Sequence, residues 1–427
     1  MSPARTDVPG RRGRPRSARG TRTGGSPRAR ARTVLPCVAA LIAAALPTAA
    51  GRAAAPEPAG RPCVASAQPD AGQPRRILDI ARQAVRELHL NAVVVRVERD
   101  GREVVTGALG ESMTGVPATA DMRFRSGAVA IAYLGTVLLQ LVDEGKVGLD
   151  DPVSRWLPDL PHAEQTTLRM LGGSTTGLRD YVPDPRFVAE LYANPFRQWT
   201  PRELIALSTD RPLLYAPGTN WSYSHANFVI LGAALEKITG TPLDRLLRER
   251  VMGPLGMRNT TNAFTAAIPD PVLHSFDAER GKYEESTFWN PSWTTARGAV
   301  LTTDVCDLAR SARAIGAGEL ISPSSLRTQL NPGTVGLGTA TRSCPASVCF
   351  AQRPDRHFGL GVVVQNDWVT QTPSFAGYAA IQAYLPAERP AIAVATTIGP
   401  NAPEGNTAQT VAERIAAALA PSHPLAK

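Results

Sequence analysis

Apolar positions recur with the period of a helix in some segments of the chain and alternate as in a strand in others. Residues 75–88 read RRILDIARQAVREL, and their apolar positions recur with the period of an α-helix. Residues 93–110 alternate around Asp100-Gly101, a dipeptide typical of a tight β-hairpin. The sequence therefore predicts an amphipathic helix followed by two antiparallel strands.

The middle of the chain has helical spacing. Residues 124–153 read FRSGAVAIAYLGTVLLQLVDEGKVGLDDPV, which predicts a buried helix that ends in an acidic turn. Further helices are predicted at residues 201–208, 228–240 and 307–318. Glycines stand where the C-terminal caps of three of these helices belong, namely Gly145, Gly240 and Gly316.

The last part of the chain returns to strand-like runs, at residues 358–365, 378–386 and 391–399, and closes with an amphipathic helix at 408–420. Terminal helices around strands, with a helical block between them, predict an α+β fold. We expect a mostly antiparallel sheet flanked by the N- and C-terminal helices, with an inserted helical subdomain, in one domain over residues 75–421.

Charge separates the N-terminus from the rest. The net charge is +9, but residues 1–55 hold eleven arginines against Asp7, so the remainder carries about −1 and lacks the basic surface that nucleic acids require. An apolar run at residues 33–50 follows the arginines and predicts a cleaved export signal. The alternative is a membrane anchor, but the run is short and holds Pro36 and Pro47. Residues 56–74, rich in Ala, Pro and Gly, are expected to form a disordered linker.

Four cysteines remain once Cys37 leaves with the signal, and an even number suits an exported chain with disulfides. Four cysteines allow three pairings. The short stretch RSCPASVCF favours Cys344 with Cys349, which leaves Cys63 to pair with Cys306; the alternative is free buried thiols. The six histidines show no ligand spacing with cysteines or acids, so we expect no metal site.

Several segments occur in an order that resembles the penicillin-recognising serine hydrolases, in the branch of class C β-lactamases, D-alanyl-D-alanine carboxypeptidases and esterases. The segments are FRSGAVAIAYLGTVLLQLVDEGKVGLDDPVSRWLPDL, TTGLRDY, APGTNWSYSHANFVILGAALEKITG, MGPLGMRNT, NPSWTTARGAVLTT and FGLGVVV. The resemblance covers nearly all of residues 75–420. It implies a serine β-lactamase-like fold and three motifs that carry the chemistry.

The first motif of this family is Ser-X-X-Lys at a helix start, which supplies a nucleophile and the lysine that helps to remove its proton. A hydroxyl needs such a base because it is a weak nucleophile at neutral pH. In this sequence the serine position is Ala128 and the lysine position is Ile131. No serine in the chain has a lysine three places later.

The second motif, Tyr-X-Asn, survives in part as Tyr223-Ser224-His225. Tyr223 is either a retained proton carrier or a packed aromatic with a satisfied hydroxyl. His225, at the asparagine position, is either a new base or a polar wall residue.

The third motif, Lys or His, then Thr or Ser, then Gly, reads Gln371-Thr372-Pro373, followed by Ser374. We expect Gln371, Thr372 and Ser374 to line the binding strand. Because proline has no N–H, we expect Pro373 to prevent an acyl-donor peptide from lying against this strand in the usual way.

Two functional readings compete. In the first, the protein is an exported, catalytically inactive relative that binds or scaffolds in the cell envelope, and its ligand is a peptidoglycan stem peptide or another small peptide or ester. In the second, it is an active hydrolase with a relocated nucleophile, chosen from Ser126, Ser174 and Ser374, that acts with His225 or Tyr223. A purely structural envelope protein is not separable from the first reading by sequence. No cofactor is expected, and contact with a membrane is expected only through the export signal.

Overall fold

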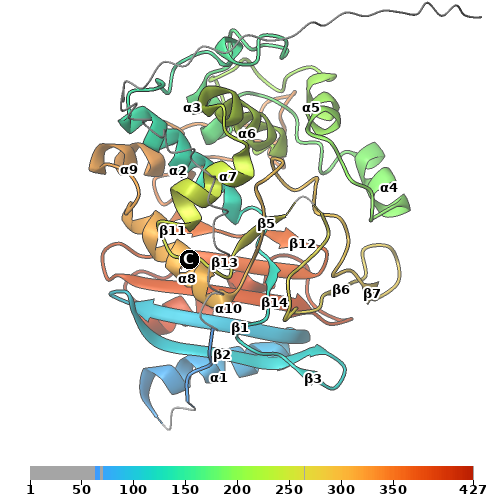
Figure 1. Ribbon diagram of the computed structural model, residues 1–427, viewed down its shortest axis with the longest axis vertical. Coiled ribbons are helices and arrows are strands. Elements are labelled where there is room, and N and C mark those ends of the chain that lie inside the picture. The colour runs from blue at the N-terminus through green and yellow to red at the C-terminus, as the bar shows by residue number, and fades with distance from the viewer. Residues whose placement is uncertain (1–62, 68–70, 264, 427) are drawn as a thin grey trace, which may run out of the picture. The chain divides into compact units, whose positions relative to one another are not determined.

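The computed structural model describes residues 63–67, 71–263 and 265–426, which belong to one compact unit (Figure 1). The predicted export signal at 1–55 lies outside the described residues. Within them, a nine-stranded sheet follows the order β3-β2-β1-β14-β13-β11-β10-β9, and β12 pairs with β13. Every pairing in it is antiparallel. The strands of this sheet are β1 (Leu90–Arg99), β2 (Arg102–Met113), β3 (Val116–Pro117), β9 (Arg356–Phe358), β10 (Val363–Gln365), β11 (Trp368–Gln371), β12 (Ser374–Phe375), β13 (Tyr378–Tyr384) and β14 (Pro390–Ile398).

The central strands are buried on both faces, because helices cover both. On β1, Ala92 and Val94 join the apolar cluster on one face, whereas Val93 and Val95 join the cluster on the other. Helices α1 (Gly72–Glu87) and α10 (Thr407–Leu419) pack on the second face, and α8 (Val305–Ala317) packs on the first. The predicted α+β fold with flanking terminal helices is confirmed.

The inserted helical part lies beyond α8 (Figure 1). Its helices are α2 (Val129–Asp143), η1 (Val153–Arg155), α3 (Leu168–Gly173), α4 (Pro185–Ala193), α5 (Pro201–Thr209), α6 (His225–Thr239), α7 (Leu243–Leu247), η2 (Arg248–Met252) and α9 (Pro323–Leu330). Short strands connect this part to the large sheet, namely β4 (Phe124–Arg125), β5 (Thr261–Ala263), β6 (Phe276–Asp277), β7 (Glu284–Glu285) and β8 (Val300–Thr303). Helix α2 is buried along nearly its whole length, as its apolar sequence predicts.

Two sequence expectations differ from the structure in position. The left-handed cap of α8 is Gly318, with φ of 69°, and not Gly316. Gly316 lies inside the helix, where an added Cβ would come within 2.6 Å of Tyr384, so its small size serves close packing. The domain also continues past residue 421, because Leu425 is buried in the α1/α10 cluster and the indole of Trp368 donates a hydrogen bond to the carbonyl of His423.

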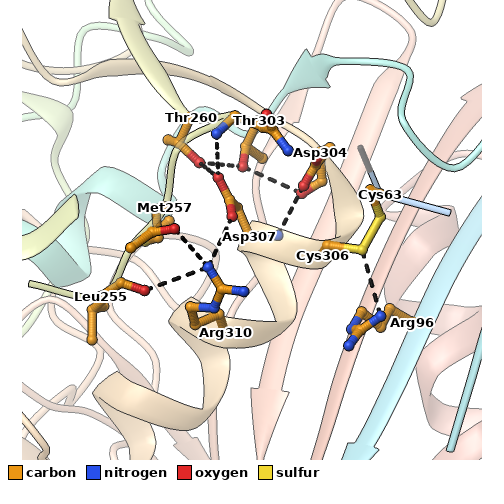
Figure 2. Close-up of polar contacts among 12 residues, drawn as sticks. Cys63, Arg96, Leu255, Met257, Thr260, Thr303, Asp304, Cys306, Asp307 and Arg310 are labelled. Carbon is orange, nitrogen blue, oxygen red and sulfur yellow. Dashed lines mark hydrogen bonds and ion pairs between the residues drawn. A yellow bond between two sulfur atoms is a disulfide. The ribbon is translucent and has the colours of Figure 1, made fainter. Parts of the chain in front are cut away.

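Both predicted disulfides are present. Cys344 and Cys349 close a five-residue separation, and Cys63 joins Cys306 across 243 residues. Figure 2 shows the second disulfide beside Asp304, whose side chain caps the start of α8, and beside Arg96, which contacts the Cys306 sulfur at 3.5 Å. Residues 63–67 are thereby fixed to the domain, which differs from the expectation of a disordered linker over residues 56–74.

None of the helices within the described residues combines the length and the apolar character that crossing a bilayer requires.

Candidate active site

The first motif lies where the chain turns from β4 into α2. Gly127 has a positive φ of 37° and turns the backbone so that Ala128 becomes the residue that caps the helix start. The N–H groups of the first helical residues already bond to carbonyls three residues back, as Val129 does to Ser126 at 3.0 Å. The N–H of Ala128 has no acceptor within the described residues. The helix start thus keeps one backbone donor at the nucleophile position.

No side chain at this helix start can do the family's chemistry. Ala128 is half-buried, and Ile131 is 1% exposed inside the main apolar cluster. Ser126 does not compensate, because its hydroxyl is buried and finds no hydrogen-bond partner among the described residues. The nucleophile position, Ala128, is therefore partly accessible to solvent, whereas the base position, Ile131, is buried among apolar side chains.

The third motif forms the wall opposite this helix start. A Cβ added to Gly127 would lie 3.2 Å from the Cβ of Pro373, so the first and third motifs meet. Gln371, at the position of the family's cation, is buried and donates a hydrogen bond from Nε2 to the carbonyl of Gly361 at 2.5 Å. Thr372 is half-buried and Ser374 is exposed. A neutral amide therefore stands where a charge would bind an anionic ligand group.

The expectation that Pro373 prevents a peptide from lying along this strand is wrong. Its carbonyl accepts the N–H of Ala380 on β13 at 2.9 Å, so its backbone faces β13. Backbone groups alternate in direction along an antiparallel pair, so Thr372 and Ser374 direct their N–H and C=O groups away from β13. The N–H that proline lacks would have joined the sheet and would not have met a ligand. The expected obstacle to a peptide on this strand edge is therefore absent.

The second motif places Tyr223 just before α6. Its ring contacts Phe228 and Phe358 at centroid distances of 5.8 and 6.0 Å, and its hydroxyl has no hydrogen-bond partner among the described residues. Burial and the nearby Asp180 carboxylate both raise the pKa of Tyr223. A phenol in this setting stays protonated at neutral pH. Tyr223 is thus packed as an aromatic, although its hydroxyl is not satisfied.

His225 begins α6 and is held by Asp180. Its Nδ1 lies 3.0 and 3.1 Å from the two carboxylate oxygens, and its backbone N–H also donates to Asp180. Burial alone would raise the pKa of Asp180, but the interaction with His225 and backbone N–H donors outweighs it, and the pKa is lowered. The pair resembles the base and orienting acid of a catalytic triad in geometry.

Trp293 links the second motif to the third. Its ring lies 6.2 Å from the His225 ring and 5.8 Å from the Phe375 ring, centroid to centroid. Sequence reasoning overlooked both Trp293 and Asp180 as site residues. A signal for each was available, because Asp180 lies in the segment TTGLRDY and Trp293 in NPSWTTARGAVLTT, two segments that carry the family resemblance.

Among the described residues, neither of the two other serines considered as a relocated nucleophile forms a hydrogen bond with His225. The Ser174 hydroxyl donates to the carbonyl of Ser222 and accepts from Asn227, and it is fully buried. Ser374 is exposed and lines a cavity of about 650 Å³ that also includes Trp293 and Phe375. Ser374 is therefore the more accessible of the two.

A group of potential metal ligands lies elsewhere, at the start of α8. Cys63, Asp304 and Cys306 bring one sulfur or oxygen each within 4.8 Å of one another. Both sulfurs are joined in the disulfide of Figure 2, so neither is available as a thiolate. This group therefore does not form a metal site.

Comparison with known proteins decides the family. A family model described as Beta-lactamase matches residues 77–417. The chain belongs to the beta-lactamase family. This beta-lactamase family chain is 27% identical to Esterase EstB of Burkholderia gladioli over 332 residues, which cover 69% of this chain and 81% of the esterase. It is 31% identical to Penicillin-binding protein 4 of Amycolatopsis lactamdurans over 231 residues, which cover 52% of this chain and 58% of that protein.

Solved structures agree on the fold of this beta-lactamase family chain. A D-stereospecific amidohydrolase from Streptomyces sp. has a TM-score of 0.66 and 26% identity, and the match covers 78% of this chain and 97% of that one. The D-amino acid amidase of Ochrobactrum anthropi has a TM-score of 0.68 at 22% identity, over 82% and 99% of the two chains. The expected resemblance to serine β-lactamases and penicillin-binding proteins is confirmed.

Proposed function

We propose that this beta-lactamase family member is a catalytically inactive protein that binds a peptide ligand in the cell envelope. The observation that carries the proposal is the side-chain chemistry at the start of α2, where Ala128 and Ile131 occupy the positions of the nucleophile and the base. A hydrolase of this family needs both groups, because one attacks and the other accepts its proton.

The size of the loss supports inactivity. In enzymes whose nucleophile and base act as a unit, removing a central member lowers kcat by about 10⁶, which corresponds to about 8 kcal/mol. The backbone N–H of Ala128 can still stabilise a developing oxyanion, but it cannot attack a carbonyl. Burial and the nearby Asp180 raise the pKa of Tyr223, which disfavours the phenolate that would have to replace the missing base.

Retained binding features support a ligand. The edge of the sheet at Thr372 and Ser374 directs backbone groups away from β13, and an adjoining cavity of about 650 Å³ has the size of a small-molecule site. Similar proteins include Penicillin-binding protein 4 and a Putative D-alanyl-D-alanine carboxypeptidase of Escherichia coli, and those names suggest peptidoglycan stem peptides as the ligand class.

Location in the envelope is the second part of the proposal. Two disulfides suit an oxidising compartment outside the cytoplasm. The arginine-rich start followed by an apolar run at residues 33–50 suits an export signal. N-terminal sequencing of the protein recovered from the culture medium or cell envelope should show a start after residue 48; recovery of the uncut chain from the cytoplasm would contradict this part.

Covalent probes test the inactivity. Purified protein is incubated with a fluorescent penicillin and, separately, with a fluorophosphonate, and an active penicillin-binding protein serves as the positive control. We expect neither probe to label this protein. Stoichiometric labelling by either probe would overturn the inactive assignment.

One observation favours a second candidate, an active hydrolase with a relocated nucleophile. The His225–Asp180 pair supplies a base and an orienting acid, and Ser374 is an exposed serine that lines the same cavity as Trp293, whose ring lies 6.2 Å from the His225 ring. If this candidate holds, the fluorophosphonate labels the protein and Ser374→Ala abolishes the label. Ser174→Ala is a poor control because Ser174 is structural, so Ser324→Ala, at an exposed serine in α9, serves instead.

A further inference from the structure

The cavity beside β12 is enclosed by segments that are distant in sequence. Its volume is about 650 Å³, and its lining comes from the α4 region, the end of β6, Trp293, the β12–β13 hairpin and residues between 398 and 405 at and after the end of β14. Figure 1 shows β12, β6 and α4 on the same side of the described unit. We call this cavity the β12 pocket. It extends the edge of the sheet that the third motif provides.

The charge of the β12 pocket is of one sign. Asp277, Glu279 and Glu404 line it, and no Lys, Arg or His is among its described lining residues. Asp277 is 2% exposed and forms no ion pair with any described residue; its carboxylate accepts the N–H of Glu279 at 2.8 Å. The two nearest cations in sequence, Arg280 and Lys282, are both paired with Glu284.

A buried carboxylate without a cation is costly, because water no longer solvates its charge. Burial and the neighbouring Glu279 raise the pKa of Asp277 to about 6. With a pKa of about 6 the group is mainly ionised at neutral pH, and Asp277 is among the residues that line a cavity large enough for a ligand. A positive charge placed in the cavity would remove this cost.

Aromatic rings complete the lining. Trp293 and Phe375 lie 5.8 Å apart, and Tyr192 lines the same cavity and donates a hydrogen bond to Glu279. The faces of aromatic rings attract cations through their quadrupole, most strongly when the cation is desolvated. Carboxylates and aromatic faces together therefore select a cation on an organic ligand, and they disfavour an anion.

We infer that the β12 pocket binds an ammonium group of the peptide ligand, while the peptide backbone lies along the edge of β12 at Ser374. The inference rests on the proposed function, because it names the charge of the ligand that the inactive protein binds. The ligand is accordingly a peptide with a free amine on the residue that enters the pocket, as in a stem peptide whose diamino acid is not cross-linked.

Two probe peptides that differ by one charge test the inference. Nα-acetyl-L-lysyl-D-alanyl-D-alanine keeps a free ε-ammonium, and its Nα,Nε-diacetyl form does not. Isothermal titration calorimetry of the full chain at pH 7.5 should give at least about a tenfold lower Kd for the free amine, which corresponds to about 1.4 kcal/mol.

Three variants localise the effect. Asp277→Asn and Glu279→Gln should each reduce the preference for the free amine, measured as the ratio of the Kd values of the two peptides. Glu279 is exposed, so its variant tests the site even if Asp277→Asn folds poorly. Glu164→Gln changes the net charge equally, at an exposed residue that does not line the pocket, and it should keep the full preference.

The outcomes separate the two proposals. Equal affinity for the two peptides would overturn the ammonium inference and leave the proposed binding function in place. A preference for the free amine that persists in both pocket variants would overturn the assignment to the β12 pocket. Absence of binding by either peptide would overturn the proposed peptide-binding function, and the inference with it.

Discussion

The start of α2 and the rest of the candidate site differ in the charge of their side chains. At the helix start, Ala128 and Ile131 leave no charged or nucleophilic side chain, and the base position is 1% exposed. Elsewhere in the site, Asp180 is paired with His225, and Asp277 is buried beside the β12 pocket, whose described lining residues include no cation. The comparison teaches that this fold forms around an apolar helix start while carboxylates remain elsewhere in the site, although the wall directly opposite the helix start holds the neutral amide of Gln371.

The largest expected effect comes from forcing a charge into the apolar wall. Ile131→Lys places an ammonium inside the main apolar cluster, and we expect it to lower the free energy of unfolding by roughly 3–5 kcal/mol. Ile131→Met, which conserves volume, should cost less than about 1.5 kcal/mol. Urea unfolding of both variants measures the difference, and equal stability would show that the site holds water or an unseen partner.

The second prediction concerns the hydrolytic activity of a double variant at the start of α2. Ala128→Ser with Ile131→Lys restores the nucleophile and the base, but Gln371 remains where the family has a cation. We expect little hydrolysis of a chromogenic cephalosporin by the double variant. Robust turnover would show that catalysis does not require a cation at the position of Gln371.

The next effect concerns the paired carboxylate. Asp180→Asn removes the charge that holds His225, and we expect a loss of about 1–3 kcal/mol at neutral pH. Because the pKa of Asp180 is lowered in the fold, its contribution is present above its ordinary value of 3.8 and is lost as the pH falls through the lowered value. Thermal melts of both proteins should therefore converge at low pH; a constant gap would mean that the effect is steric.

The unpaired carboxylate should behave with the opposite sign. Asp277→Asn removes a charge that the fold disfavours, so we expect a gain on the order of 1 kcal/mol above pH 6. The pKa of Asp277 is raised to about 6 from 3.8, so the gain should shrink between these values and vanish below the lower one. Melts from pH 4 to pH 8 measure it. A loss of stability at pH 8 would show that Asp277 has a cationic partner.

The smallest effect tests the proline at the junction of the two walls. Pro373→Gly restores an N–H that can bond to β13, a gain of about 1 kcal/mol, but it increases the entropy of the unfolded chain by a similar amount. We expect a net change within about 0.5 kcal/mol and unchanged peptide affinity, because this N–H faces the sheet. A large change in peptide affinity would show that the backbone N–H at position 373 faces the ligand and not β13.

Much of the fold could be predicted because periodicity is local. The spacing in residues 75–88 and 408–420 predicted α1 and α10, and Asp100-Gly101 predicted the β1–β2 turn, where both residues have positive φ. Strand β11 was missed, since WVTQ is only four residues long and its burial comes from neighbours on β10 and β13. Periodicity cannot report such neighbours.

The sequence by itself determined which reacting groups are absent, because a side chain that is not encoded cannot be supplied by folding. The substitutions Ala128, Ile131 and Gln371 were identified from the amino-acid sequence alone. Only the tertiary structure decided which way the backbone of Pro373 faces, that Asp180 holds His225, and that Asp277 lies at a cavity with aromatic walls. The direction of a backbone group and the partner of a charge depend on contacts between segments distant in sequence, and these exist only once the chain has folded.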